Sequence, residues 1–147
     1  MIRKEQFKKV VKKSIQSAAF DYLIDLKERH SKMTNIQYSE LNQQEYLKSS
    51  QVPAHKAKSL FKFRTRMNRV RSNFKQSHAD LSCPLCLVAE DRDDHLLECI
   101  KIKEYCIQIS QNITAKYMDI FSSSIEKMVA AVDLLDAAMK VRETILD

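Results

Sequence analysis

Three cysteines and one histidine are spaced along the chain as ligands for a metal ion. Cys83 and Cys86 enclose two residues, and His95 is followed four positions later by Cys99. Zn²⁺ prefers four tetrahedral nitrogen and sulfur ligands, so three thiolates and one imidazole suit it. A tight turn that contains Pro84 directs the first two thiolates to one point. The sequence therefore predicts a zinc site.

These residue types also have an interpretation without a metal. Cys is often a small buried hydrophobic residue, and His is often a hydrogen-bonded core residue. The joint spacing of three Cys and one His within seventeen positions favours the metal. Because protein fills all four metal positions, we expect a structural site and not a catalytic one. His78 lies close enough to Cys83 to be a substitute ligand, and Cys106 is left as a core thiol or a spare.

The second half of the site is expected in a helix that begins at Asp93 and continues to about Ser110. Positions four apart lie on one helix face, so His95 and Cys99 should point the same way. Asp93 and Asp94 suit the positive end of the helix dipole. A turn and a helix would together close the site, and folding of at least residues 80–105 should depend on the metal.

Residues 56–75 carry eight Lys and Arg and no acidic residue. Pro53 suits the first turn of a helix over this stretch. Apolar residues recur at helical spacing along it: Leu60, Phe63, Met67, Val70 and Phe74. Arginine can hold phosphate oxygens through two parallel hydrogen bonds, so we predict a nucleic-acid contact rather than a solvated basic face. The predicted contact residues are Lys58, Lys62, Arg64, Arg66, Arg69, Arg71 and Lys75.

Three further helices are expected. Residues 3 to about 30 form a long one whose apolar stripe is predicted to be a packing face rather than a membrane anchor. The lysines at its start are either solvated or in contact with phosphate. A loop from Ser31 to Gln37 and a short helix from Ser39 to about Lys48 follow. The last helix, capped within residues 122–124, is expected from about Ile125 to Leu146 and belongs to the core or binds a partner.

The composition of the 147 residues, with no Gly and two Pro, disfavours folds that need glycine at turns or around phosphates. Hydrophobic residues at 44% and charged residues at 30% indicate a globular protein. We predict a mostly α fold, a small helical domain of four to five helices with one CCHC zinc knuckle. Residues 1–50 form an N-terminal helical segment and 51–147 the basic helix, knuckle and C-terminal helices, or 1–147 forms one continuous domain.

The net charge of +6 is unevenly distributed. Residues 1–82 contain eighteen Lys and Arg against seven Asp and Glu, whereas residues 83–147 contain seven against twelve. A basic half suits a polyanion such as RNA or DNA. No stretch reaches the roughly 20 apolar residues that a membrane span needs. Because a secretory pattern is also missing, we expect an intracellular protein, nuclear or cytoplasmic, with reduced thiols.

Several motifs together resemble a known family. The segments are Ala57–Met67, the Cys83–Cys86 knuckle and Glu90–Cys99, with weaker likeness over 19–49 and 119–146. They resemble the C-terminal region of endonuclease–reverse transcriptase proteins of non-LTR retrotransposons. The resemblance implies a Cys/His module that follows a polymerase and holds template RNA or target DNA. It carries Cys83, Cys86, His95 and Cys99 over as ligands, with Arg64 and Arg66 in the basic segment.

The polymerase and endonuclease motifs of that family do not occur in this sequence. Asp21 and Asp25 are four apart on an expected helix, whereas a polymerase needs adjacent aspartates. A fragment, a decayed copy and a domesticated descendant all fit the resemblance. We therefore predict a non-catalytic, zinc-stabilised nucleic-acid-binding module. The alternatives are a zinc-stabilised structural or protein-interaction module, which self-associates or binds a protein through the C-terminal helix, and, less favoured, an enzyme.

Overall fold

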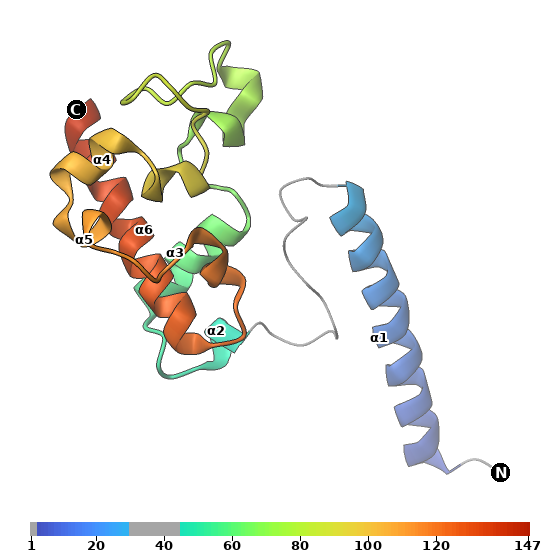
Figure 1. Ribbon diagram of the computed structural model, residues 1–147. Coiled ribbons are helices and arrows are strands. Elements are labelled where there is room, and N and C mark those ends of the chain that lie inside the picture. The colour runs from blue at the N-terminus through green and yellow to red at the C-terminus, as the bar shows by residue number, and fades with distance from the viewer. Residues whose placement is uncertain (1–2, 30–44) are drawn as a thin grey trace.

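The computed structural model describes residues 3–29 and 45–147 of the chain. Within these residues the fold is mostly helical, as predicted (Figure 1). The α-helices are α1 (Lys4–Arg29), α2 (Glu45–Lys48), α3 (Ala54–Arg64), α4 (Ile100–Tyr105), α5 (Ile107–Ser110) and α6 (Ile125–Leu146). Three short 3-10 helices accompany them: η2 (Arg71–Ser77), η3 (Asp94–Leu97) and η4 (Tyr117–Phe121). The expected loop at 31–37 and the start of the short helix at Ser39 lie outside the described residues.

The core forms where α6 packs against α3, η3, η4, α4 and α5 (Figure 1). On α6, Met128, Val132 and Leu135 are fully buried, so the apolar stripe predicted for the last helix lies in the core. Ser124 caps this helix, because its hydroxyl accepts a hydrogen bond from the Lys127 N–H at 3.4 Å. From α3 the core receives Leu60 and Phe63. The last helix, α6, is thus the element against which the other core helices pack.

Helix α1 has the predicted extent and lies apart from the other helices in Figure 1. Its apolar side chains are exposed, among them Phe7 at 60%, Ile15 at 63% and Tyr22 at 61%. The stripe predicted as a packing face is therefore not covered by described parts of this chain. No helix in the described residues is long and apolar enough to cross a membrane.

The prediction of a single basic helix over residues 56–75 is wrong, because α3 ends at Arg64. Arg66 has a φ of 53°, the left-handed conformation that ends many helices. Two backbone hydrogen bonds close this end, from the Met67 N–H to the Lys62 carbonyl at 2.9 Å and from the Arg66 N–H to the Phe63 carbonyl at 3.4 Å. Together they form a Schellman motif. Its left-handed residue is usually glycine, but this chain contains no glycine and Arg66 takes that position.

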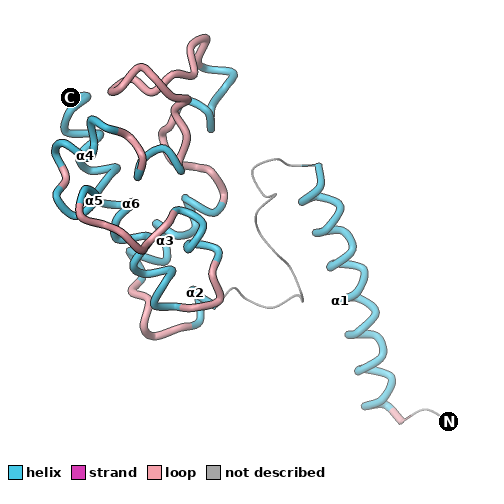
Figure 2. The backbone as a smooth tube through the Cα atoms, in the orientation of Figure 1, coloured by secondary structure: helices cyan, strands magenta, loops and turns pink. Residues whose placement is uncertain are grey.

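The helix predicted from Asp93 to about Ser110 is also interrupted. It is divided into η3, α4 and α5 because Cys99 and Cys106 both have extended backbone, with ψ of 121° and 99°. The interruption at Cys99 lies at a predicted ligand. Figure 2 shows the result as short helical pieces joined by loops, with loop backbone preceding η3. The short helices place core residues such as Ile102 and Ile109, while the extended backbone at Cys99 sets that residue apart from the helices on either side.

Candidate metal centre

The four predicted ligands converge in space. The thiols of Cys83, Cys86 and Cys99 and the imidazole of His95 all lie within 4.8 Å of one another. The Cys83 and Cys99 sulfurs are 3.8 Å apart, and the Cys86 sulfur is 3.3 Å from His95 Nε2. With Zn–S bonds of about 2.3 Å, two thiolates at tetrahedral corners lie about 3.8 Å apart. The donor set and its spacing therefore fit one metal ion.

The first two ligands lie on a tight turn. The Leu87 N–H donates to the Cys83 carbonyl at 2.9 Å, and the Cys83 N–H donates to the Ala89 carbonyl at 2.7 Å. Leu87 has a φ of 60°, so the chain places a leucine where the turn favours glycine. An isolated antiparallel bridge between Ser82 and Glu90 closes the base of this turn. The turn predicted around Pro84 thus directs both thiols to the same side.

The other two ligands come from the segment that joins η3 to α4. His95 lies within η3, and Cys99 is the residue that precedes α4. The Cys99 N–H donates to the His95 carbonyl at 2.8 Å, which holds the two ligands one turn apart. Their proximity was predicted, although the backbone achieves it through a 3-10 turn and an extended residue instead of one continuous helix.

The two knuckle thiols have opposite pKa shifts. Burial raises the pKa of Cys83 to about 11, although N–H groups of Cys86 and Leu85 oppose this. Burial also acts to raise the pKa of Cys86, but it is outweighed by N–H donors of Ala89 and Val88 and by His95, so that pKa falls to about 6. N–H groups that point at sulfur stabilise thiolate charge, which is the form that binds a metal.

Two residues lie outside this cluster: His78, considered above as a substitute ligand, and Cys106, the fourth cysteine. His78 is exposed and is not among the four clustered groups, so the substitute-ligand alternative finds no support in the geometry. Cys106 is buried at 7% exposure and belongs to the core. All four cysteines are free thiols.

A buried ion pair attaches the metal segment, residues 83–99, to the core. Both guanidinium NH groups of Arg142, on α6, donate to the two carboxylate oxygens of Asp91 at 2.7 Å. The two side chains are 5% and 1% exposed. Asp91 also accepts the Arg71 N–H at 2.8 Å. The pair was not predicted from the sequence, since an acid and an arginine 51 positions apart carry no local pattern.

Asp93, between Asp91 and His95, is a second buried acid. Burial raises its pKa to about 6, while the hydrogen bond from the Asn73 amide, at 2.9 Å, and the nearby charge of Arg66 act to lower it. The role expected for Asp93 as a first-turn helix residue is thus replaced by a buried link to η2.

The seven basic residues predicted to contact nucleic acid do not form one surface. Arg64 is only 8% exposed, and its Nε donates to the Ile120 carbonyl at 2.7 Å. Its guanidinium also lies 4.7 Å from the centre of the Tyr46 ring, and burial lowers its pKa. Arg71 is partly buried and donates to the carbonyls of Asp80 and Ser82 at 3.4 and 3.2 Å. Both arginines have structural partners inside this chain.

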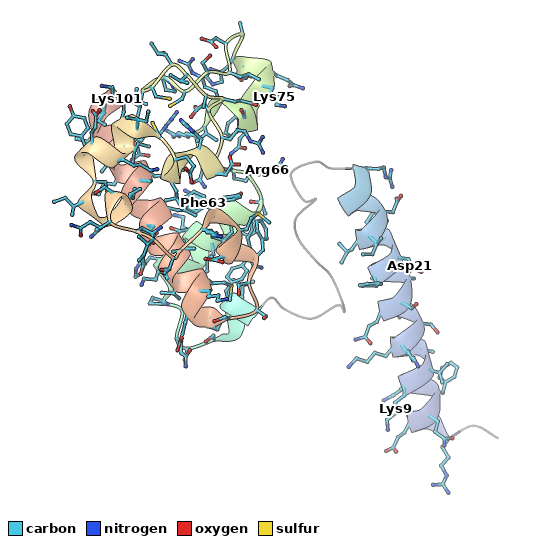
Figure 3. The ribbon with its side chains drawn as sticks, viewed as in Figure 1. Lys9, Asp21, Phe63, Arg66, Lys75 and Lys101 are labelled. Carbon is cyan, nitrogen blue, oxygen red and sulfur yellow. The ribbon has the colours of Figure 1, made fainter. Side chains whose placement is uncertain are left out.

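The other five predicted residues are accessible. Lys58 and Lys62 are exposed on α3, Arg69 is exposed in the following turn, and Lys75 is exposed on η2. Arg66 is half-buried; Figure 3 labels it where α3 meets the metal segment, with Phe63 in the core beside it. The predicted basic helix is therefore replaced by separate exposed cations on α3, on η2 and in the turn between them.

Comparison with known proteins identified no family for this chain. No protein-family model matches the chain, and no curated protein or solved structure matches it significantly. The resemblance to retrotransposon reverse transcriptase proteins stays a prediction from the sequence.

Proposed function

We propose that the chain is a zinc-stabilised module that binds RNA or DNA and is not catalytic by itself. The observation that carries the proposal is the convergence of Cys83, Cys86, His95 and Cys99 within 4.8 Å. A tetrahedral set of three sulfurs and one nitrogen favours zinc over harder ions such as magnesium or calcium. Because the set is complete without water, the metal would hold the fold together.

The nucleic-acid partner is supported by charge. Arg66 and Lys75 line the same cleft as His95. Of the acids around the candidate ligands, Asp91 is paired with Arg142 and Asp93 is hydrogen-bonded to Asn73, while the exposed Asp94 and Glu98 are paired with Arg92 and Lys103. Exposed Lys and Arg that neutralise phosphates release bound counterions, which gives salt-sensitive affinity with little sequence preference. The sequence resemblance to the region after a retrotransposon polymerase points to the same partner class.

A structural or protein-interaction module is the second candidate. The observation in its favour is the exposed apolar stripe on α1, which the described part of the chain does not cover. An amphipathic helix gains most of its stability from packing of its apolar face, so such a stripe suits a partner. In this interpretation the zinc site only replaces hydrophobic core that a small domain lacks.

The test is titration of labelled RNA and DNA with the zinc-loaded full chain, followed by fluorescence polarisation at two salt concentrations. We expect binding whose logarithmic affinity falls by about 0.7 for single strands, per phosphate contact, with each tenfold rise in salt. Molar mass in solution is measured in parallel. A stable dimer with no nucleic-acid affinity at low salt would contradict the first proposal and support the second.

A further inference from the structure

An open cleft of about 1080 Å³ lies beside the metal centre. Metal ligand His95 is part of its wall. The remaining wall comes from segments far apart in the sequence: Arg66 beyond the end of α3, η2, residues 89–98 around η3, α4, α5 and η4. The cleft is therefore assembled only when the metal segment is folded against the C-terminal helices.

Two of the five cations on the cleft wall already have partners. Arg92 Nε lies 3.4 Å from a carboxylate oxygen of Asp94, and Lys103 Nζ lies 3.7 Å from one of Glu98. All four side chains are at least partly exposed, so these pairs contribute little to stability. They do, however, neutralise two of the four acids on the wall.

The other three cations form no ion pair among the described residues. They are Arg66 after α3, Lys75 on η2 and Lys116 before η4, and they come from three separate parts of the wall. The two remaining acids are engaged: Glu90 accepts the Ser72 hydroxyl at 2.7 Å, and Asp93 is buried against Asn73. Hydrogen bonds from neutral groups leave both carboxylates charged, so three cations without an ion pair stand against two acids and the wall keeps a small positive excess.

The same cleft also has an apolar side. Ile113 and Met118 line it with exposed fractions of 92% and 56%. Tyr117 also lines the cleft and is half-buried, with its ring edge-on to Phe121 at 6.2 Å between centroids. Cations suit phosphates, and apolar or aromatic groups suit the faces of unpaired bases. The two together suit a nucleic-acid strand that exposes both.

We propose that this cleft binds single-stranded nucleic acid. Phosphates lie against Arg66, Lys75 and Lys116, and unpaired bases lie against Tyr117 and Met118. A duplex fits less well, because stacking inside it covers the base faces. The inference rests on the proposed function and assigns it a surface, in place of the exposed face of α3.

Arg66 offers a variant that separates binding from folding. Its φ of 53° is a conformation that glycine adopts without steric cost, so Arg66→Gly removes the guanidinium while the end of α3 keeps its geometry. Leu87→Gly is the matched control, since Leu87 has a φ of 60°, is 72% exposed and carries no charge. Lys58→Ala with Lys62→Ala removes charge from the exposed face of α3 instead.

The experiment measures polarisation of a short labelled RNA and of the DNA strand of the same sequence with the zinc-loaded full chain. We expect Arg66→Gly to weaken binding about tenfold and to reduce the salt slope by about 0.7, with no fall in Tm. Leu87→Gly should bind as the parent does. Comparable affinity for RNA and DNA would indicate contacts to phosphates and bases, and tighter RNA binding a contact to the 2′-hydroxyl as well.

Each contrary result has its own meaning. Unchanged affinity in Arg66→Gly, with weaker binding in the α3 double variant, would overturn the cleft and leave the proposed function intact. Tighter binding of a duplex than of either strand would overturn the single-strand assignment. A parent protein that binds no strand at low salt would defeat the proposed function and the cleft together, and would favour an acidic protein segment as occupant.

Discussion

The metal segment (residues 83–99) and the basic segment (residues 56–75) were both conspicuous in the sequence, but only in the first do the predicted side chains come together in space. All four ligand atoms of the metal segment meet within 4.8 Å. In the basic segment Arg64 and Arg71 turn toward carbonyl groups of the chain, while Lys58 and Lys62 stay exposed. The Cys/His pattern identified side chains that come together, whereas the basic pattern did not identify which cations share a surface.

The difference follows from the chemistry of the two patterns. Thiolates and imidazole satisfy one another around a metal only at fixed distances, so their spacing carries geometric information. A guanidinium can be satisfied by a phosphate, by a carbonyl or by an aromatic face. A run of arginines therefore does not indicate which of them face solvent. Three predictions sharpen this contrast, in order of expected effect.

Loss of a metal ligand should have the largest effect. Cys99→Ser is expected to abolish metal binding and unfold residues 80–105, because structural zinc sites contribute on the order of 10 kcal/mol to folding. Hydrogen exchange measured by mass spectrometry should show lost protection in that segment. Cys106→Ala is the control, since Cys106 is buried outside the cluster. It should lower Tm slightly while one metal ion is retained, and retention of metal by Cys99→Ser would contradict the ligand set.

The next largest effect is expected at the buried pair between Asp91 and Arg142. Arg142→Met leaves the Asp91 carboxylate buried without its charged partner, which should cost about 3–5 kcal/mol in the free energy of unfolding by urea. Arg92→Met is the matched control, because Arg92 and Asp94 are 54% and 49% exposed. That variant should change stability by less than about 1 kcal/mol. Equal costs for the two variants would show that Arg142 does not anchor the metal segment.

A smaller effect separates Arg64 from its exposed neighbour Lys62. Arg64→Ala should destabilise the fold by about 2–3 kcal/mol, since it removes the hydrogen bond to Ile120 and the contact with the Tyr46 ring. Lys62→Ala should lie within about 0.5 kcal/mol of the parent. Thermal unfolding measures both. If the two variants prove equally stable, Arg64 is not the structural residue that its burial indicates, and its role in nucleic-acid binding would be reopened.

Local signals in the sequence predicted part of this structure. Apolar periodicity predicted the first and last helices, and the serines at 122–124 predicted a cap for the last one, which the structure assigns to Ser124. The break at Arg66 was missed because, in a chain without glycine, an ordinary residue occupies the left-handed position. The break at Cys99 was missed because any residue can adopt extended backbone, so no residue type marks it. The link from Asp91 to Arg142 was missed because it joins positions remote in sequence. Such features depend on tertiary packing, which a single sequence does not display.

The central claim is that the four clustered side chains bind one metal ion that folds the segment around them. Native mass spectrometry of the full chain, purified without chelator, tests this most directly. We predict the mass of one zinc per chain in the parent, with none in Cys99→Ser. A parent protein that carries no metal and keeps protection of residues 80–105 against hydrogen exchange would contradict the claim.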